Sequence, residues 1–131
     1  MTSLKTVAGK TTFYLTMAWM GAALSLAHLA LRIAGGGDFW IGFTVGGLIV
    51  SLTVLLRRKL RDEYVERLWS AGTSAAFIVV AILFLLRPFV DGAFGSLTGA
   101  PWNFDITGYA MPIALLAFFA AFHAAHLRSR L

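Results

Sequence analysis

The chain lacks cysteine and has few charged side chains: 13% of its 131 residues are Asp, Glu, Lys or Arg. The absence of cysteine excludes a disulfide-stapled secreted domain. Soluble domains carry about 25% charged residues, so this chain has too little charge to cover a water-facing surface. Hydrophobic residues make up 59% of the chain, and the mean hydropathy is +0.79. The class that remains is an integral membrane protein.

Long apolar runs dominate the sequence. A helix that crosses a bilayer needs about 20 mostly apolar residues. Four stretches meet or approach this length: 12–33, 39–56, 69–87 and 106–127. The third is expected to stop at Arg87-Pro88, because proline cannot continue the helical ladder. Alternation with a period of two is absent, so barrel strands are not favoured. The sequence predicts an all-α fold, a single-domain, antiparallel, up-down four-helix bundle in a membrane.

Positive charge is distributed unevenly. Two Lys residues precede the first span, five basic residues lie between the second and third spans, and two Arg residues follow the fourth. Only Arg32 and Arg87 fall at the opposite ends. Because cytoplasmic segments retain Lys and Arg, we expect a multi-pass protein of the bacterial cytoplasmic (inner) membrane with both termini in the cytoplasm. Beside apolar spans, these charges favour anionic lipid as a partner and not nucleic acid.

The connection 57–68 contains no Gly or Pro, and we expect it to be helical. Opposite charges recur there at helical spacing, in Arg58–Asp62, Lys59–Glu63 and Glu63–Arg67. The residues expected to contact anionic lipid or a cytoplasmic partner are Arg57, Arg58, Lys59, Arg61, Asp62 and Glu63. The connection 88–105 is instead rich in Gly and Pro and is expected to be a long outer loop. At this surface Arg32 and Arg87 can pair with Asp38, Asp91 or Asp105.

Small residues four apart allow helices in lipid to approach closely. The second span contains Gly42-x-x-x-Gly46 followed by Gly47, and the third contains Gly72-x-x-x-Ala76. Two interpretations are open for these residues. The first is packing between helices of one bundle, which we favour because every span has such a face. The second is a homodimer seam along the second span.

Few residues suggest chemistry. No Asp, Glu, Lys or Arg lies in the middle of a span, although ion-coupled transporters generally need one there. The candidate cofactor ligands are His28, His123 and His126. His123 and His126 share one helix face, but two histidines make an incomplete zinc site, and His28 lies at another depth. We therefore expect no metal, no cofactor and no enzymatic activity.

The segment Arg61-Asp62-Glu63-Tyr64-Val65-Glu66-Arg67, followed by Ala71, resembles the span 2–3 connection of small uncharacterised prokaryotic four-span membrane proteins. In those proteins an Asp-Glu pair follows a basic cluster. The chain departs from the pattern at Tyr64, where arginine more often stands. The resemblance covers about a dozen residues and implies a four-span fold.

Taken together, these features favour a non-enzymatic accessory, assembly or regulatory subunit of a membrane complex, with a membrane protein or a second copy of the chain as partner. Two alternatives stay open. One is a small transporter or pore built by oligomerisation, and the other is a membrane subunit that binds haem or a pigment through histidine.

Overall fold

The computed structural model describes residues 2–100 and 105–131. Within these ranges the chain is almost entirely helical and forms no strand. Its elements are α1 (Thr2–Ala34), α2 (Asp38–Leu56), η1 (Arg58–Leu60), α3 (Glu63–Thr98), η2 (Thr107–Tyr109) and α4 (Ala110–Arg128). Each α-helix contains a segment long and apolar enough to cross a membrane. The all-α fold with four helices of spanning length is therefore confirmed.

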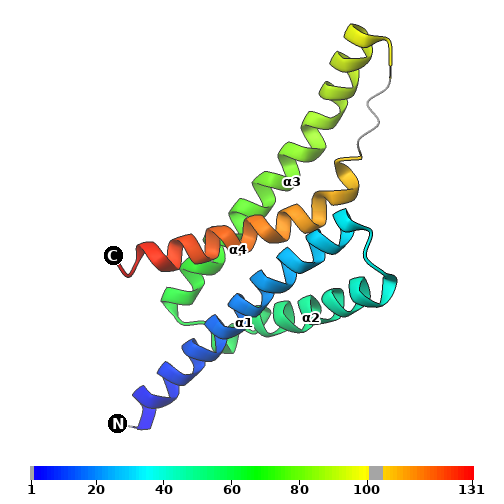
Figure 1. Ribbon diagram of the computed structural model, residues 1–131. Coiled ribbons are helices and arrows are strands. Elements are labelled where there is room, and N and C mark those ends of the chain that lie inside the picture. The colour runs from blue at the N-terminus through cyan, green and yellow to red at the C-terminus, as the bar shows by residue number, and fades with distance from the viewer. Residues whose placement is uncertain (1, 101–104) are drawn as a thin grey trace.

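The helices alternate in direction, and both termini lie on the same side of the molecule (Figure 1). The principal contacts join α3 to α4, α4 to α1, and α1 to α2. No comparable contact joins α2 to α3 in the described part of the chain. The bundle is therefore open on one side, with neighbours in the order α2, α1, α4, α3.

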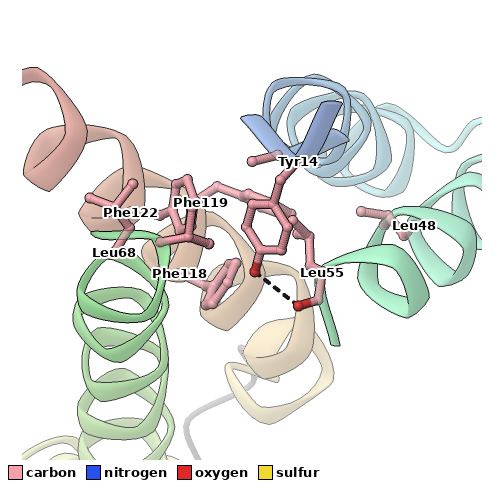
Figure 2. Close-up of a cluster of buried hydrophobic side chains, with 9 residues drawn as sticks. Tyr14, Leu48, Leu55, Leu68, Phe118, Phe119 and Phe122 are labelled. Carbon is pink, nitrogen blue, oxygen red and sulfur yellow. Dashed lines mark hydrogen bonds between the residues drawn. The ribbon is translucent and has the colours of Figure 1, made fainter. Parts of the chain in front are cut away.

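The hydrophobic core lies near the termini, where all four helices meet (Figure 2). Its members are Tyr14 and Ala18 of α1, Leu48 and Leu55 of α2, Val65 and Leu68 of α3, and Phe118, Phe119 and Phe122 of α4. We call this region, with the η1 connection, the packed end. The opposite part of the molecule, where α3 separates from the other helices (Figure 1), is the open end.

Helix α3 corrects two expectations about the third span and the segment after it. The helix does not stop at Arg87 but continues through Pro88 to Thr98, so most of the expected outer loop is helical. Residues 101–104 of that loop lie outside the described residues. An ion pair between Arg87 and Asp91, 3.5 Å long, spans the proline. The helix ends at Gly99, whose left-handed φ of 67° suits glycine.

The connection before α3 also differs from its expectation of a continuous helix. Residues 58–60 form one 3₁₀ turn, and the α-helix begins only at Glu63. The side chain of Asp62 accepts a hydrogen bond from the backbone N–H of Val65 at 2.8 Å and so caps α3. A capping residue has an extended backbone, which explains why the helix cannot run back through Asp62.

The other span boundaries agree more closely with the sequence. Helix α2 begins one residue before the predicted 39–56 stretch and ends with it. Helix α4 and η2 cover nearly all of the predicted 106–127 stretch. Helix α1 is longer than the predicted 12–33 stretch, because it begins at Thr2.

Candidate functional site

Three polar contacts join α1 to α2. At the packed end the Tyr14 hydroxyl donates to the Leu55 carbonyl at 2.8 Å (Figure 2). Further along, the Ser51 hydroxyl donates to the carbonyl of Met17 at 2.7 Å. Towards the open end, Nδ1 of His28 lies 2.9 Å from Oγ1 of Thr44. In lipid, such interhelical hydrogen bonds hold helices together, since burial from water supplies no force between them.

The hydrogen bonds of Thr44 determine the tautomer of His28. A threonine hydroxyl has one proton, and Thr44 donates it to the carbonyl of Ile41 at 2.8 Å. Nδ1 of His28 must therefore carry the proton that it shares with Thr44. In the neutral imidazole, a proton on Nδ1 leaves a lone pair on Nε2. Nε2 makes no hydrogen bond to any described residue.

A cavity of about 210 Å³ lies beside His28, between α1, α2 and α4. Its polar contributors are His28 and Arg32 of α1 and the backbone at Gly108, and its apolar walls include Leu48, Leu52 and Leu115. The guanidinium of Arg32 lies 5.5 Å from the centre of the Tyr109 ring. His126 also lines a cavity that contains a basic side chain, Arg130, but that cavity lies at the packed end.

His123 has a different environment from His28. It is buried, and its ring stacks on that of Trp19 with a centroid separation of 3.8 Å. Neither ring nitrogen makes a hydrogen bond, although the carbonyl of Ala18 lies nearby. The hydroxyl of Ser25 is likewise buried without a partner. Trp19 covers one face of the His123 ring, and both residues line a cavity of about 420 Å³ between α1 and α4.

His126 belongs to a polar network at the packed end. Its Nδ1 lies 2.6 Å from the hydroxyl of Tyr64, which also lies 2.8 Å from the hydroxyl of Ser129. The Ser129 hydroxyl donates to the His126 carbonyl at 2.7 Å. This network connects α3 to the end of α4. The structure thus separates the three candidate histidines among three unrelated environments, and the described residues contain no cluster of three or more His, Cys, Asp or Glu side chains.

The basic connection divides into a structural part and an exposed part. Arg57, Arg58 and Lys59 are exposed. The side chain of Arg61, only 8% exposed, donates to the Leu55 carbonyl at 3.1 Å and pairs with Glu66 at 3.2 Å. Its guanidinium also lies 4.1 Å from the centre of the Trp69 ring. Arg61 is therefore not available for the lipid or partner contact that the sequence suggested.

The acidic members of the connection are also engaged within the chain. Asp62 caps α3 and accepts a hydrogen bond from Thr11 at 3.1 Å. Glu63 pairs with Arg67 at 2.7 Å, as its spacing predicted. The predicted pairs of Arg58 with Asp62 and Lys59 with Glu63 do not form, because the 3₁₀ turn breaks the helical spacing.

The glycines expected at helix contacts fall into two groups. Gly72 lies against Phe118 of α4, and Gly47 lies against Leu24 of α1; a Cβ at either position would approach the neighbour to 2.7 Å. Ala76 packs beside the core. By contrast, a Cβ at Gly42 or Gly46 would meet no atom within 4 Å. These two glycines therefore make no contact within the described chain, contrary to the interpretation of packing inside one bundle.

At the open end, Arg87 connects α3 to the segment before η2. It donates to Asp105 at 3.1 Å and also to the Thr107 hydroxyl. Asp105 further accepts hydrogen bonds from Thr107 at 2.7 Å and from the backbone of Gly108 at 3.2 Å. These donors, with the Arg87 charge, hold the pKa of the Asp105 carboxyl below its ordinary value. Arg87 thus pairs with Asp91 and Asp105, as predicted, whereas neither Arg32 nor Asp38 forms an ion pair within the described residues.

Tyr14, Thr44 and Ser51 make hydrogen bonds between α1 and α2 that the sequence reasoning missed. The signal was a heptad-like spacing: the buried residues of α1 are Tyr14, Ala18, Gly21, Ser25 and His28, and those of α2 are Thr44, Leu48, Ser51 and Leu55. Polar residues in such a stripe face a neighbouring helix. No protein-family model, curated protein or solved structure matches the chain, so its functional assignment depends on this geometry.

Proposed function

We propose that the chain is a non-catalytic accessory subunit that assembles with another membrane protein through α3. The observation that carries the proposal is the length and isolation of this helix. Its 36 residues correspond to about 54 Å, against about 30 Å for the hydrocarbon core of a bilayer. All of its buried residues (Val65, Leu68 and Gly72) lie in its first third.

The remainder of α3 is mostly apolar and has no buried residue. Phe89 is 70% exposed and Leu97 is 85% exposed, and both follow Arg87. Lipid can cover the exposed Leu and Phe residues nearer the middle of the helix. An upright helix of this length would carry Phe89 and Leu97 beyond the hydrocarbon, where a protein partner is the covering that supports their exposure.

Photocross-linking tests the assembly. A photoreactive phenylalanine analogue is placed at Phe89 or Leu97 in the expressed, membrane-inserted chain, and at Phe43 of α2 as the matched control on an exposed helix face. We expect protein adducts from the α3 positions and lipid adducts alone from Phe43. Lipid adducts alone from all three positions, together with elution as a monomer from mild detergent, would overturn the proposal.

We further propose that the protein lies in the bacterial cytoplasmic membrane with both termini in the cytoplasm. The support is the excess of Lys and Arg in the terminal segments and in the 57–68 connection. Because the chain has no cysteine, Lys59→Cys and Gly95→Cys give clean single labelling sites. An impermeant maleimide should label Gly95→Cys in intact spheroplasts and Lys59→Cys only after permeabilisation. Labelling of both from the same side would contradict the orientation.

A second candidate function is a small transporter or pore formed by several copies. The open space around Gly42 and Gly46 favours it, because a neighbouring chain could approach α2 closely there. Solute flux into proteoliposomes should then be lost in Gly46→Leu and kept in Gly95→Leu, a control glycine with equally open surroundings. Equal flux, or no flux, in all three proteins would exclude the pore.

A further inference from the structure

The cavity beside His28 combines features that identify a ligand class. It is lined by residues of α1, α2, η2 and α4, including Leu48, Leu52, Pro112 and Leu115, and by the side chains of His28 and Arg32. His28 itself is only 7% exposed. Its Nδ1 has a protein partner, whereas Nε2 has none among the described residues and remains accessible to a ligand.

The hydrogen-bond donors and acceptors in the cavity determine which polar groups a ligand must carry. The fixed tautomer makes Nε2 of His28 an acceptor, so a ligand must present a hydrogen-bond donor to it. Arg32 offers only donors, and no carboxylate of the described residues lies within ion-pair distance of it. Because the two residues are four apart on α1, they lie on one helix face. The ligand therefore carries a hydroxyl for His28 and a nearby oxygen acceptor for Arg32.

The size and the surroundings of the cavity restrict the class of ligand that it can bind. A cavity of about 210 Å³ lies below the range of about 300–1,000 Å³ for drug-sized ligands, so it fits a single aromatic ring and not a haem macrocycle. The rim residues Val45, Ile49 and Met111 are exposed on the lipid-facing side, which leaves an exit for an alkyl tail. An ionised carboxylate or phosphodiester head group could accept hydrogen bonds from Arg32, but it has no proton to donate to Nε2 of His28.

We propose that this cavity binds the hydroquinone head group of a membrane-soluble lipid, with one hydroxyl donating to Nε2 of His28 and a ring oxygen accepting from Arg32. The site lies between α1, α2 and α4 and uses no residue of α3. It is thus independent of the assembly proposed above and can be tested separately from it.

The test uses the full chain in nanodiscs and trimethylhydroquinone as the probe, kept reduced under argon. The matched control ligand is its dimethyl ether, which has the same ring but no hydroxyl proton. We expect saturable binding of the hydroquinone by titration calorimetry, with the ether bound about tenfold or more weakly because it cannot donate to Nε2. Equal affinity for the two ligands, or no binding of either, would overturn the proposal.

Three variants locate the site. His28→Asn keeps an amide donor for Thr44 near the Nδ1 position but removes Nε2. Arg32→Gln removes the charged donor. Each variant should weaken hydroquinone binding about tenfold. Val45→Phe should block the cavity without changing either polar group. The matched control is His126→Asn at the packed end, which should bind as the unaltered chain does. Unchanged affinity in both His28→Asn and Val45→Phe would show that the ligand lies elsewhere.

A spectroscopic readout separates binding from a loss of structure. In ¹⁵N-histidine NMR, the Nε2 resonance of His28 should shift when the hydroquinone is added and stay in place with the ether. Two competing occupants are also distinguishable. Tighter binding of laurate than of hydroquinone would assign the cavity to an anion held by Arg32. A Soret band on adding haem, lost in His28→Asn, would assign it to haem; either result overturns the hydroquinone.

Discussion

The packed end and the open end contain the same types of apolar residue but use them differently. At the packed end, Phe119, Phe122 and Leu55 are buried among all four helices. At the open end, Leu85 and Phe89 of α3 face outward. In water that exposure would be costly. In a bilayer, lipid tails are as apolar as leucine, so close packing and hydrogen bonds decide where helices meet.

Polar side chains show the same contrast. At the packed end, Arg61 and Tyr14 both donate to the carbonyl of Leu55, which is one of the carbonyls left without a helical partner where α2 ends. At the open end, Nε2 of His28 has no such partner. The hydrogen bonds that join the connection to the core are therefore concentrated at the packed end, although His123 beside Phe122 leaves both ring nitrogens without a partner.

The largest expected effect is that of removing a buried ring from the packed end. Phe122 is fully buried and lies near Tyr14 and Phe118, so Phe122→Ala should lower the free energy of unfolding by about 3–5 kcal/mol. Phe89→Ala, the control at the open end, should change it by no more than about 0.5 kcal/mol. Unfolding in mixed micelles, followed by circular dichroism, measures both. Equal losses of unfolding free energy in the two variants would contradict the difference in packing between the two ends.

A smaller loss is expected when the buried charge of the connection is removed. Arg61→Gln loses the bond to Leu55, the pair with Glu66 and the contact with Trp69, and should cost about 1.5–3 kcal/mol. Arg58 is exposed, so Arg58→Gln is the matched control and should be nearly neutral. The same unfolding measurement applies. A neutral Arg61→Gln would mean that this arginine does not tie the connection to the core.

Two glycine substitutions should change the free energy of unfolding in opposite directions. In Gly72→Ala the new methyl would meet Phe118, including its carbonyl oxygen at 3.0 Å, so a loss of about 1–3 kcal/mol is expected. In Gly46→Ala the methyl meets nothing within 4 Å, and alanine is the better helix former by up to about 1 kcal/mol. Destabilisation by Gly46→Ala would instead indicate a close neighbour from another chain.

The smallest effect is expected at the open end, at the Arg87–Asp105 contact. Because the folded state lowers the pKa of Asp105, the ionised carboxylate favours folding, and this contribution exists above its ordinary pKa of 3.8. The contribution disappears as the pH falls through the lowered value. Asp105→Asn should therefore be slightly less stable than the unaltered chain near pH 7 and equal to it in strong acid. A stability difference between the two proteins that persists at low pH would show that it does not come from the ionised Asp105 carboxylate.

Much of the fold could be predicted from the sequence, because span length depends on local composition. The limits of α2 follow from Asp38 before the apolar run and the basic cluster after it. The prediction that the third span stops at Pro88 was wrong, because a proline inside a long helix removes only one backbone hydrogen bond and can be tolerated in a spanning segment. The helical expectation for 57–62 failed because Asp62 caps α3 from outside the helix.

The candidate site was less predictable. His28 could be noticed from its residue type, but its partner Thr44 is 16 residues away on another helix. The free lone pair follows from a second hydrogen bond, from Thr44 to Ile41, which no spacing rule includes. Gly42 and Gly46 have the same small-residue spacing as Gly72 and Ala76, yet only the latter pair lies beside other side chains.

The sequence by itself determined that the chain forms four helices able to cross a bilayer, because apolar length and backbone hydrogen bonding within each segment are local properties. Only the tertiary structure decided that these helices join at one end and separate at the other, and that the three histidines line three different cavities. Those outcomes depend on which helix faces meet, and in lipid that choice is made by shape and by a few hydrogen bonds between distant residues.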